Sequence, residues 1–482
     1  MRSAPSSRLS RWLMVTAALL AGLAAACVGL PQVAVSAGAG VAALGATAPA
    51  TQASGWVVGT DAADGYGVIL HTTSGGRLWV RQGSTSDVPN VELNNVTAVD
   101  RNTAWVVGNA DSGYGVILRT ANAGLTWVRQ GGPSTVPDGA IFGVGPVDRK
   151  TAWVVGQAGT ILRTGDRGQT WTRQVSGTTA DLYEVAAVDA QTAWAVGGTD
   201  NGYGIILRTT NGGRTWRRQG TAATISSRNF IDLTAVDART AWAVGGNGLL
   251  VKTADGGLHW RSQMPYGLSD NNGVAAVDGK TAWVASDYGA LHRTTDGGTV
   301  WNEQDPALPG DFYLLGVRAL GRKIAWVVGG AVFPATGGII LHTMDAGATW
   351  QIQSTPVEVT FRRASFVAPT PAITLKLSGL SGGTLRLGRR VTAKGVVTPG
   401  GLTGSKVKLS LQKKRDHQWI TVKIVTRTIG AGGAYRWMYR PAQRIYYRLR
   451  ATIAQTTTHT AATTTWRAFK VKKMAGGCPG RK

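Results

Sequence analysis

Aspartates recur along the chain in a fixed context, two residues before a glycine and five before a tryptophan. The four copies are Asp166, Asp255, Asp296 and Asp345, followed by Trp171, Trp260, Trp301 and Trp350. Carboxylates gathered in one place could act as general acid and base or hold a divalent metal. An acid that returns once per repeat instead indicates a turn, because a short Asp side chain accepts backbone N–H groups there. We therefore predict that these residues are structural.

Other residues that carry chemistry are sparse. The chain has six His, two Cys and four Glu. The histidines are scattered, and the sequence contains no Ser-His-Asp arrangement, phosphate-binding loop or pair of His at metal-ligand spacing. Two distant cysteines cannot supply a disulfide framework or a Cys-based metal site. The pattern predicts no catalytic residue, no metal and no cofactor.

A repeated unit runs through residues 54–369. In each unit a Thr, a Gly and a Gln keep constant distances from a second tryptophan. The first tryptophans are Trp56, Trp105, Trp153, Trp194, Trp242, Trp283 and Trp326, and the second are Trp79, Trp127, Trp171, Trp216, Trp260, Trp301 and Trp350. Repeats of about 40–50 residues with several short strands have the size of a propeller blade. We predict an all-β chain that forms a seven-bladed β-propeller with four strands per blade.

The two ends of the repeat region are expected to meet. Trp56 follows the leader almost directly, so the first unit lacks the strand that opens the others. The strand-like run from Thr360 to Ala368 follows the last unit and has no other partner. We predict that it completes the first blade, because a closed ring leaves no long open sheet edge.

The turn Thr-x-Asp-x-Gly-x-Thr-Trp, best seen from Thr164 to Trp171 and from Thr343 to Trp350, resembles the Asp-box of sialidase-type propellers. The whole unit is similar to the propeller family of photosystem II assembly and stability factors, over about residues 54–370. That resemblance implies the fold and a non-enzymatic assembly role. The enzymatic alternative is a sialidase-like glycoside hydrolase. It would need an arginine cluster and a Tyr–Glu pair, but Tyr183 and Glu184 are adjacent in a strand and point to opposite faces.

Three tyrosines indicate a binding surface. Tyr66, Tyr114 and Tyr203 lie in loops between the second and third strands of only three units, whereas a structural residue would recur in all seven. Variable aromatic loops on a rigid scaffold are a common place for binding a protein or glycan. We predict that Arg228 and Phe230 complete this surface. The alternative is that the aromatic side chains plug the blade tops.

A second candidate is a set of basic residues at one repeat position. Arg119, Arg163 and Arg208 precede the repeat Thr, where the other units carry His71, Lys252, Arg293 and His342. Propeller symmetry would arrange them as a ring that an acidic partner could contact. The alternative is an outer strand face in contact with solvent.

The N-terminus has the pattern of a secretory signal. Arg2, Arg8 and Arg11 precede or begin an apolar stretch that reaches Leu30. We predict a signal peptide over residues 1–37, a leader over 38–53 and a secreted or envelope-associated protein. A retained membrane anchor and lipid attachment at Cys27 stay open as alternatives.

The C-terminal part carries nearly all of the net charge. Residues 370–482 contain 23 Lys and Arg and one acid, Asp416. We predict a basic β-sandwich over 370–474, which resembles immunoglobulin-like modules through its strand pattern and Trp419, and a disordered tail over 475–482. Such a charge favours an anionic cell-wall polymer or membrane surface; nucleic acid is not expected in vivo for an exported protein. The sequence thus predicts an exported, non-enzymatic binding or assembly scaffold.

Overall fold

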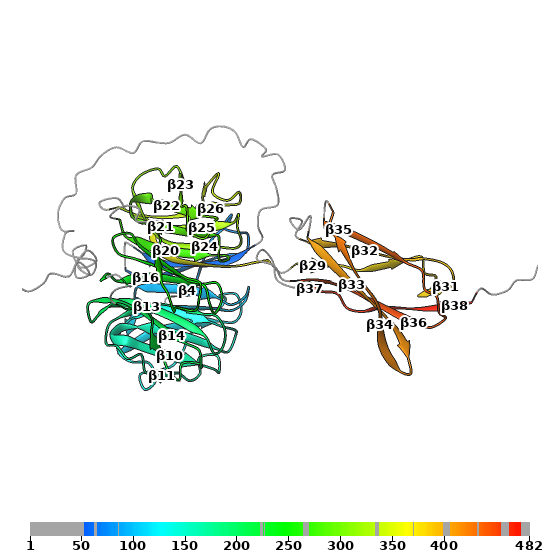
Figure 1. The fold of residues 1–482 in the computed structure, drawn as a ribbon, viewed down its shortest axis with the longest axis horizontal. Helices are drawn as coiled ribbons and strands as arrows, with labels where there is room; N and C mark the ends of the chain where they lie inside the picture. The colour runs from blue at the N-terminus through cyan, green and yellow to red at the C-terminus, as the bar shows by residue number, and fades with distance from the viewer. Residues whose placement is uncertain are drawn as a thin grey trace, which may run out of the picture. The chain divides into compact units, whose positions relative to one another are not determined.

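The structure is a computed structural model. It describes residues 53–61, 65–84, 86–221, 225, 227–263, 269–332, 337–369, 371–398, 405–430, 433–454 and 462–473. The predicted signal peptide with Cys27, most of the predicted leader and the predicted tail lie outside these residues. In the part described, the regular secondary structure is β-strand apart from two short 3-10 turns, η1 (Gln157–Gly159) and η2 (Asp287–Gly289) (Figure 1). The all-β prediction is confirmed.

Seven four-stranded antiparallel sheets form the blades. From the innermost strand outward, blade 1 is β28 (Val359–Val367), β1 (Ser54–Asp61), β2 (Gly67–Thr72), β3 (Val80–Gln82); blade 2 is β4 (Leu93–Ala98), β5 (Ala104–Asp111), β6 (Tyr114–Thr120), β7 (Val128–Arg129); blade 3 is β8 (Ile141–Pro146), β9 (Ala152–Gly156), β10 (Thr160–Thr164), β11 (Thr172–Gln174). Blade 4 is β12 (Leu182–Ala187), β13 (Ala193–Asp200), β14 (Tyr203–Thr209), β15 (Arg217–Arg218); blade 5 is β16 (Phe230–Ala235), β17 (Ala241–Gly245), β18 (Leu249–Thr253), β19 (Arg261–Ser262). Blade 6 is β20 (Asn271–Ala276), β21 (Ala282–Ser286), β22 (Leu291–Thr294), β23 (Asn302–Gln304); blade 7 is β24 (Phe312–Ala319), β25 (Ala325–Ala331), β26 (Gly338–Thr343), β27 (Gln351–Ile352).

The ring closes as the sequence predicts. Strand β28 follows blade 7 in the chain but pairs with β1 of blade 1, with Val57 opposite Ala364. Its side chains reach both neighbouring blades. Phe366 stacks on Trp326 of blade 7 at 3.8 Å between ring centroids, and the Ser365 hydroxyl accepts a hydrogen bond from the Ala98 N–H of blade 2. The seventh and first blades are therefore joined by packing and by chain connectivity.

The core of the propeller lies between blades. The seven first tryptophans of the repeat are fully buried. At four junctions the first tryptophan meets the second tryptophan of the next blade edge to face, for example Trp105 and Trp171 at 5.8 Å and Trp194 and Trp260 at 5.7 Å. Each aromatic pair adds roughly 0.5–1.5 kcal/mol beyond its area burial.

At three junctions the repeat glutamine forms hydrogen bonds to the next blade, through Gln82, Gln174 and Gln353. Gln82 accepts a hydrogen bond from the Trp56 indole N–H of its own blade at 3.0 Å, and its amide donates to the Ala123 carbonyl of blade 2 at 2.7 Å. Gln353 makes the same link across the closure, from blade 7 to Trp79 and to the Gly75 carbonyl of blade 1. The repeat glutamine is thus a contact between blades.

The repeat glycine is the other half of that contact. Gly124 has φ +82°, and a Cβ built there would lie 1.6 Å from the Gln82 Oε1. The same pairing of a positive-φ glycine with a glutamine of the preceding blade occurs at all seven junctions: Gly76, Gly124, Gly168, Gly213, Gly257, Gly298 and Gly347. Any side chain here would displace the glutamine and strain the backbone.

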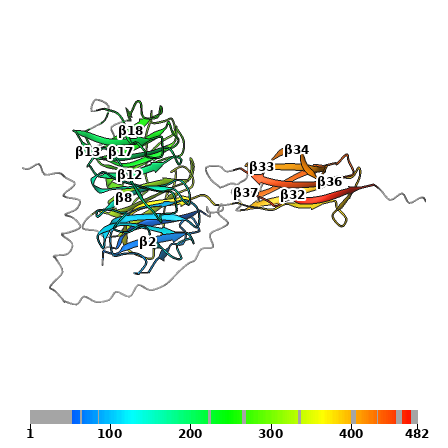
Figure 2. The ribbon, with the colours of Figure 1, turned by 90° about the horizontal axis from the view of Figure 1, so that it is seen from below.

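The residues after the propeller form two further sheets. One contains β29 (Ala372–Ile373), β30 (Lys376–Ser378), β32 (Val391–Thr398) and β35 (Ala434–Tyr439); the other contains β31 (Thr384–Arg386), β33 (Lys406–Arg415), β34 (Gln418–Thr428), β36 (Tyr446–Ile453), β37 (Ala462–Thr463) and β38 (Arg467–Lys472). Figure 2 shows these strands as two layers. Buried side chains from both, such as Val397, Trp437, Leu409 and Leu449, share one core. This agrees with a small β-sandwich; the immunoglobulin-like assignment stays a prediction.

Trp419, which suggested the immunoglobulin-like assignment, lies outside the core. Trp419 is half-buried, with the Arg448 guanidinium 4.4 Å from its ring centroid. The buried tryptophan of the domain is Trp437, on the facing sheet. In the hairpin β33–β34, Trp419 pairs with Lys414, and paired residues of neighbouring strands lie on the same face of a sheet. Lys414 and Gln412 point away from the core, so Trp419 does as well.

The contact between glutamine and glycine can be tested by adding one methyl group. Gly124→Ala should lower the unfolding free energy of the propeller by about 2–4 kcal/mol, because it combines a left-handed backbone with loss of the Gln82 hydrogen bonds. Gly165→Ala is the matched control, since nothing lies within 4 Å of a Cβ at Gly165. Denaturant unfolding of both variants measures the difference. Equal stability of the two variants would contradict this role of the glycine.

Candidate functional site

The recurring aspartates are turn residues, as predicted. Asp166 accepts hydrogen bonds from the Thr164 hydroxyl at 2.8 Å and the Thr170 N–H at 3.0 Å. The Thr170 hydroxyl and these other donors hold the pKa of Asp166 down, at about 2. Asn122 accepts the same two kinds of bond in blade 2. Because an amide replaces the carboxylate without loss of the turn, the charge is not needed for it.

The basic ring also has a structural role, which differs from both sequence interpretations. The Arg119, Arg163 and Arg208 guanidinium groups lie 5.4, 4.9 and 4.8 Å from the ring centroids of Trp105, Trp153 and Trp194. Each also donates a hydrogen bond to a carbonyl of the next blade, as Arg208 does to Ala238 at 2.8 Å. These arginines are half-buried rather than displayed on a solvated face. They connect neighbouring blades.

The three tyrosine loops share a local arrangement. The Arg129 guanidinium lies 3.8 Å from the Tyr114 ring centroid, pairs with Asp111 at 2.5 Å and donates to the Tyr114 carbonyl. Arg218 repeats this in blade 4, 3.8 Å from the Tyr203 ring and 3.3 Å from Asp200.

The first blade has the corresponding ion pair, Arg81 with Asp61 at 3.8 Å, beside Tyr66. All three tyrosines are half-exposed. The sequence carries this signal, since an Asp precedes each of these tyrosines and an Arg precedes the repeat Gln in the same blades. The loops are therefore braced, and their tyrosines still reach solvent.

The predicted companions of the tyrosines differ in accessibility. Arg228 is exposed and donates to the Asn247 carbonyl at 2.6 Å. Phe230 is wrong as a contact residue, because it is fully buried in the core between blades 4 and 5. It opens the innermost strand β16 at the position where blades 2, 3, 4 and 7 bury Leu or Ile and blade 1 buries Phe361, so packing explains it.

A cluster that sequence reasoning missed lies on the innermost strands. One position of each strand faces the ring centre at the same register, opposite Val107, Val155 and their counterparts. It is occupied by Asn95, Gly143, Glu184, Asp232, Gly273, Gly316 and Arg363 in blades 2 to 7 and 1 respectively. Aligning the inner strands by their repeat would have brought the two acids together. Viewed singly, Glu184 appears only as a neighbour of Tyr183.

Both acids are buried and hydrogen-bonded. Glu184 accepts a hydrogen bond from the Asn95 amide of blade 2 at 2.6 Å. Blade 3 lies between these two blades in the ring, and there a Cβ on Gly143 would lie 2.9 Å from the Glu184 Cα. Glu184 also accepts from the Val185 N–H, while Asp232 accepts from the Leu233 and Val274 N–H groups. Burial and the nearby Asp232 carboxylate raise the pKa of Glu184 to about 8, and burial raises that of Asp232.

Arginines surround the two acids. Arg363 acts electrostatically on both acids and donates to the Leu315 carbonyl. Arg318, on the innermost strand of blade 7, also acts electrostatically on both. Arg362 pairs with Glu92. Two acids with separated protonation states could in principle perform acid–base chemistry, but here every carboxylate oxygen accepts an internal hydrogen bond.

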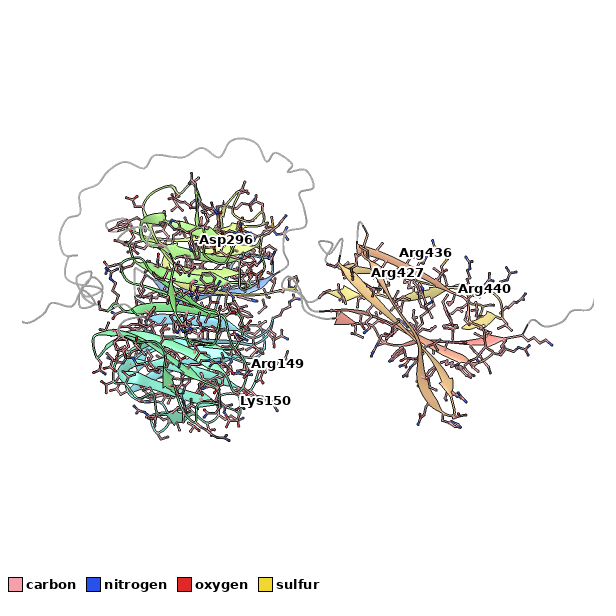
Figure 3. The ribbon with its side chains drawn as sticks, in the orientation of Figure 1. Arg149, Lys150, Asp296, Arg427, Arg436 and Arg440 are labelled. Carbon is pink, nitrogen blue, oxygen red and sulfur yellow. The ribbon has the colours of Figure 1, made fainter. Side chains whose placement is uncertain are left out.

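The second domain presents cations without acidic partners of its own. Arg386, Arg389, Arg390 and Arg440 line a hollow of about 610 Å³ together with the loop around Gly379. In Figure 3 the side chains of Arg427, Arg436 and Arg440 extend from the sheets. Asp416, the one acid in the sequence from 370 onward, is exposed and pairs with its neighbour Arg415 at 3.5 Å.

The described residues contain no group of three or more His, Cys, Asp or Glu that could hold a metal ion. Among the same residues, no helix has the length and apolarity needed to cross a membrane.

Comparison with solved structures gives matches of low similarity. A structure of YCF48 bound to D1 peptide shares 18% identity at a TM-score of 0.44, covering 54% of this chain and 80% of that one. YCF48 from Cyanidioschyzon merolae shares 20% at 0.44, covering 63% and 92%. The GH74 enzyme of Niastella koreensis shares 11% at 0.43, covering 86% and 79%. Similarities this low carry no functional argument, and no curated protein matches the chain.

Comparison with family models is more decisive. The model described as photosynthesis system II assembly factor YCF48 matches residues 44–187 and 223–364, together more than half of the chain. These ranges cover blades 2 and 3, the innermost strand of blade 4, blades 5 to 7, and blade 1 except for the last residues of β28. The chain therefore belongs to the family of the photosystem II assembly factor YCF48.

Proposed function

We propose that this chain is an exported, non-enzymatic scaffold. Its propeller binds a protein partner, and its basic second domain binds an anionic polymer or lipid surface of the cell envelope. The family description supports an assembly role. The observation that carries the proposal is that the charged repeat residues form contacts within and between blades, whereas the braced tyrosines stay half-exposed.

The tyrosine loops suit protein recognition. An arginine against one face of Tyr114 and another against Tyr203 reduce the freedom that each ring would lose on binding. Tyrosine offers a large apolar area with a hydrogen-bonding tip, which explains its frequent use in protein contacts. We therefore keep Tyr66, Tyr114, Tyr203 and Arg228 as the proposed contact surface and omit Phe230.

The sialidase-like alternative rests on Glu184 and Asp232, the acids that converge at the ring centre. A general acid needs a proton and a free oxygen near its substrate. Glu184 has a raised pKa, but its oxygens accept from Asn95 and Val185. These bonds join blades 2 and 4, which favours a structural role.

That role predicts a pH-dependent stability. The ordinary pKa of a glutamate, which applies in the unfolded chain, is 4.5, and the pKa of Glu184 in the folded chain is about 8. Between these two pH values the folded chain keeps a proton on Glu184 that the unfolded chain releases. The contribution of Glu184 to stability therefore falls as the pH rises through this window. Glu184→Gln cannot titrate, so the melting temperature of the wild type minus that of the variant should be larger at pH 5 than at pH 8.

Comparing differences removes the titration of groups that do not interact with Glu184, such as the buried His71 and His342, which both proteins share. Glu358→Gln, at an exposed glutamate before β28, is the control for replacing a carboxylate by an amide. A constant difference for Glu184→Gln would show that Glu184 does not retain its proton. Hydrolysis of glycosides that is lost in Glu184→Gln would support the enzymatic alternative instead.

The scaffold proposal is tested by changing the loop surface. The triple variant Tyr66→Ala, Tyr114→Ala, Tyr203→Ala should weaken binding of the partner captured from the native envelope by about 10-fold or more, as expected for clustered aromatic contacts. Tyr288→Ala is the control, since Tyr288 is 64% exposed in blade 6, another sector of the ring. Thermal melting checks that the triple variant folds. A folded triple variant that binds like the control would place the surface elsewhere.

A further inference from the structure

The larger sheet of the second domain has one face turned away from the core. Along β33, the side chains of Leu409 and Leu411 are buried, so Lys408, Gln412 and Lys414 between and beyond them point outward. The register places Ile424 of β34 and Arg448 and Arg450 of β36 on the same side. We call this surface, completed by Trp419, Tyr446, Trp466 and Lys470, the basic sheet face.

Cations and aromatic rings alternate on this face. The Arg448 guanidinium lies 4.4 Å from the ring centroids of both Trp419 and Trp466, and Arg450 lies 4.6 Å from Trp466. The Arg448 Nε also donates to Gln412 at 2.8 Å. On the next strand, the Lys470 ammonium lies 4.9 Å from the Tyr446 ring. These contacts hold the cations in place without neutralising their charge.

The charge of the face has no internal counterpart. Five cations point from it, and the one acid of the domain, Asp416, pairs with Arg415 in the turn between β33 and β34. A fixed array of guanidinium groups suits phosphate oxygens, which accept two hydrogen bonds from each group. The missing counter-charge must therefore come from a ligand or from solvent ions.

The apolar residues narrow the class of ligand. Ile424 is 51% exposed and Tyr446 is 45% exposed on this same face. A soluble polyanion gains nothing from an isoleucine held in water. The interface of a bilayer accepts Trp, Tyr and aliphatic side chains while its anionic headgroups attract Lys and Arg.

We propose that the basic sheet face binds the surface of a bilayer through anionic phosphate headgroups. This inference rests on the proposed role of the second domain in envelope binding and assigns it to one face and one ligand. Strands β33, β34 and β36 would lie along the membrane surface, with Arg448 and Arg450 at the phosphates and Ile424 and Trp419 at the interface.

The test is co-sedimentation of the full chain with vesicles. Phosphatidylcholine vesicles are compared with an equal mixture of phosphatidylcholine and phosphatidylglycerol. The apolar N-terminal run is present in every variant, so the excess binding to anionic vesicles is the measured quantity. The double variant Arg448→Gln, Arg450→Gln should lower it about 25-fold, because each cation near an anionic surface contributes about fivefold.

Matched controls lie on the outer face of the smaller sheet. Lys394→Gln, Arg436→Gln removes the same charge from paired, exposed positions there and should have a much smaller effect. Lys408→Gln, Lys414→Gln changes the basic sheet face without touching the stacked arginines, and should reduce binding even if the first variant is unstable. Ile424→Ser should weaken binding, while Val396→Ser, at a residue 38% exposed on the other sheet, should not.

An equal loss of anionic-vesicle binding in Arg448→Gln, Arg450→Gln and in Lys394→Gln, Arg436→Gln would overturn the inference, because binding would then depend only on total charge. An unaffected Ile424→Ser together with full competition by soluble polyphosphate would overturn it in favour of a polymer. A chain that sediments with isolated wall polymer but not with anionic vesicles keeps the proposed function and rejects the bilayer. Binding to neither rejects both.

Discussion

The propeller depends on one contact, the repeat glutamine of each blade against a positive-φ glycine of the next. A side chain at the glycine would overlap the glutamine at every junction, including the closing one between Gln353 and Gly76. At that junction and at two others the glutamine also bonds a tryptophan indole. Because each blade is narrow, with a buried tryptophan on its second strand, the fold has no core within a single blade. The hydrophobic effect can act only if neighbouring blades pack together in register. The glutamine and glycine set that register, and β28 completes the ring.

This constraint determines where function can lie. A side chain at a repeated position is committed to the ring, as the aspartate turns and the basic side chains over the tryptophans show. Departures from the repeat carry the individual properties of this chain. They are the acids and arginines at the ring centre, the three braced tyrosine loops and the entire second domain. At the ring centre these residues form contacts within the propeller, since Glu184 joins blades 2 and 4 through a hydrogen bond from Asn95. In the tyrosine loops and in the second domain, the tyrosines and cations that depart from the repeat are accessible to solvent.

Repetition made the fold predictable from sequence. Seven copies of Trp, Thr, Gly and Gln fix the blade number, and the missing first strand of the first unit identifies Thr360 to Ala368 as the closing strand. The role of single side chains was less accessible. Phe230 looks like a loop residue until its register in β16 shows that it fills a core position. Arg119 and its counterparts look like a surface ring because a sequence does not show which carbonyl of the next blade lies within reach. Glu184 and Asp232 are 48 positions apart, and only the ring brings them together. Trp419 shows the converse error, since its type predicts burial while the hairpin pairing turns it outward.

The central claim is that the propeller binds a protein through the tyrosine loops, not through the aspartate turns on the opposite ends of its strands. A photo-crosslinking amino acid placed in living cells at Tyr66, Tyr203 or Leu125 tests it directly, because Leu125 lies in the corresponding turn of blade 2 and, at 80% exposure, is more accessible than either tyrosine. The account predicts one shared crosslinked protein from Tyr66 and Tyr203, and no such product from Leu125. A product from Leu125 alone, or different products from the two tyrosine positions, would contradict it.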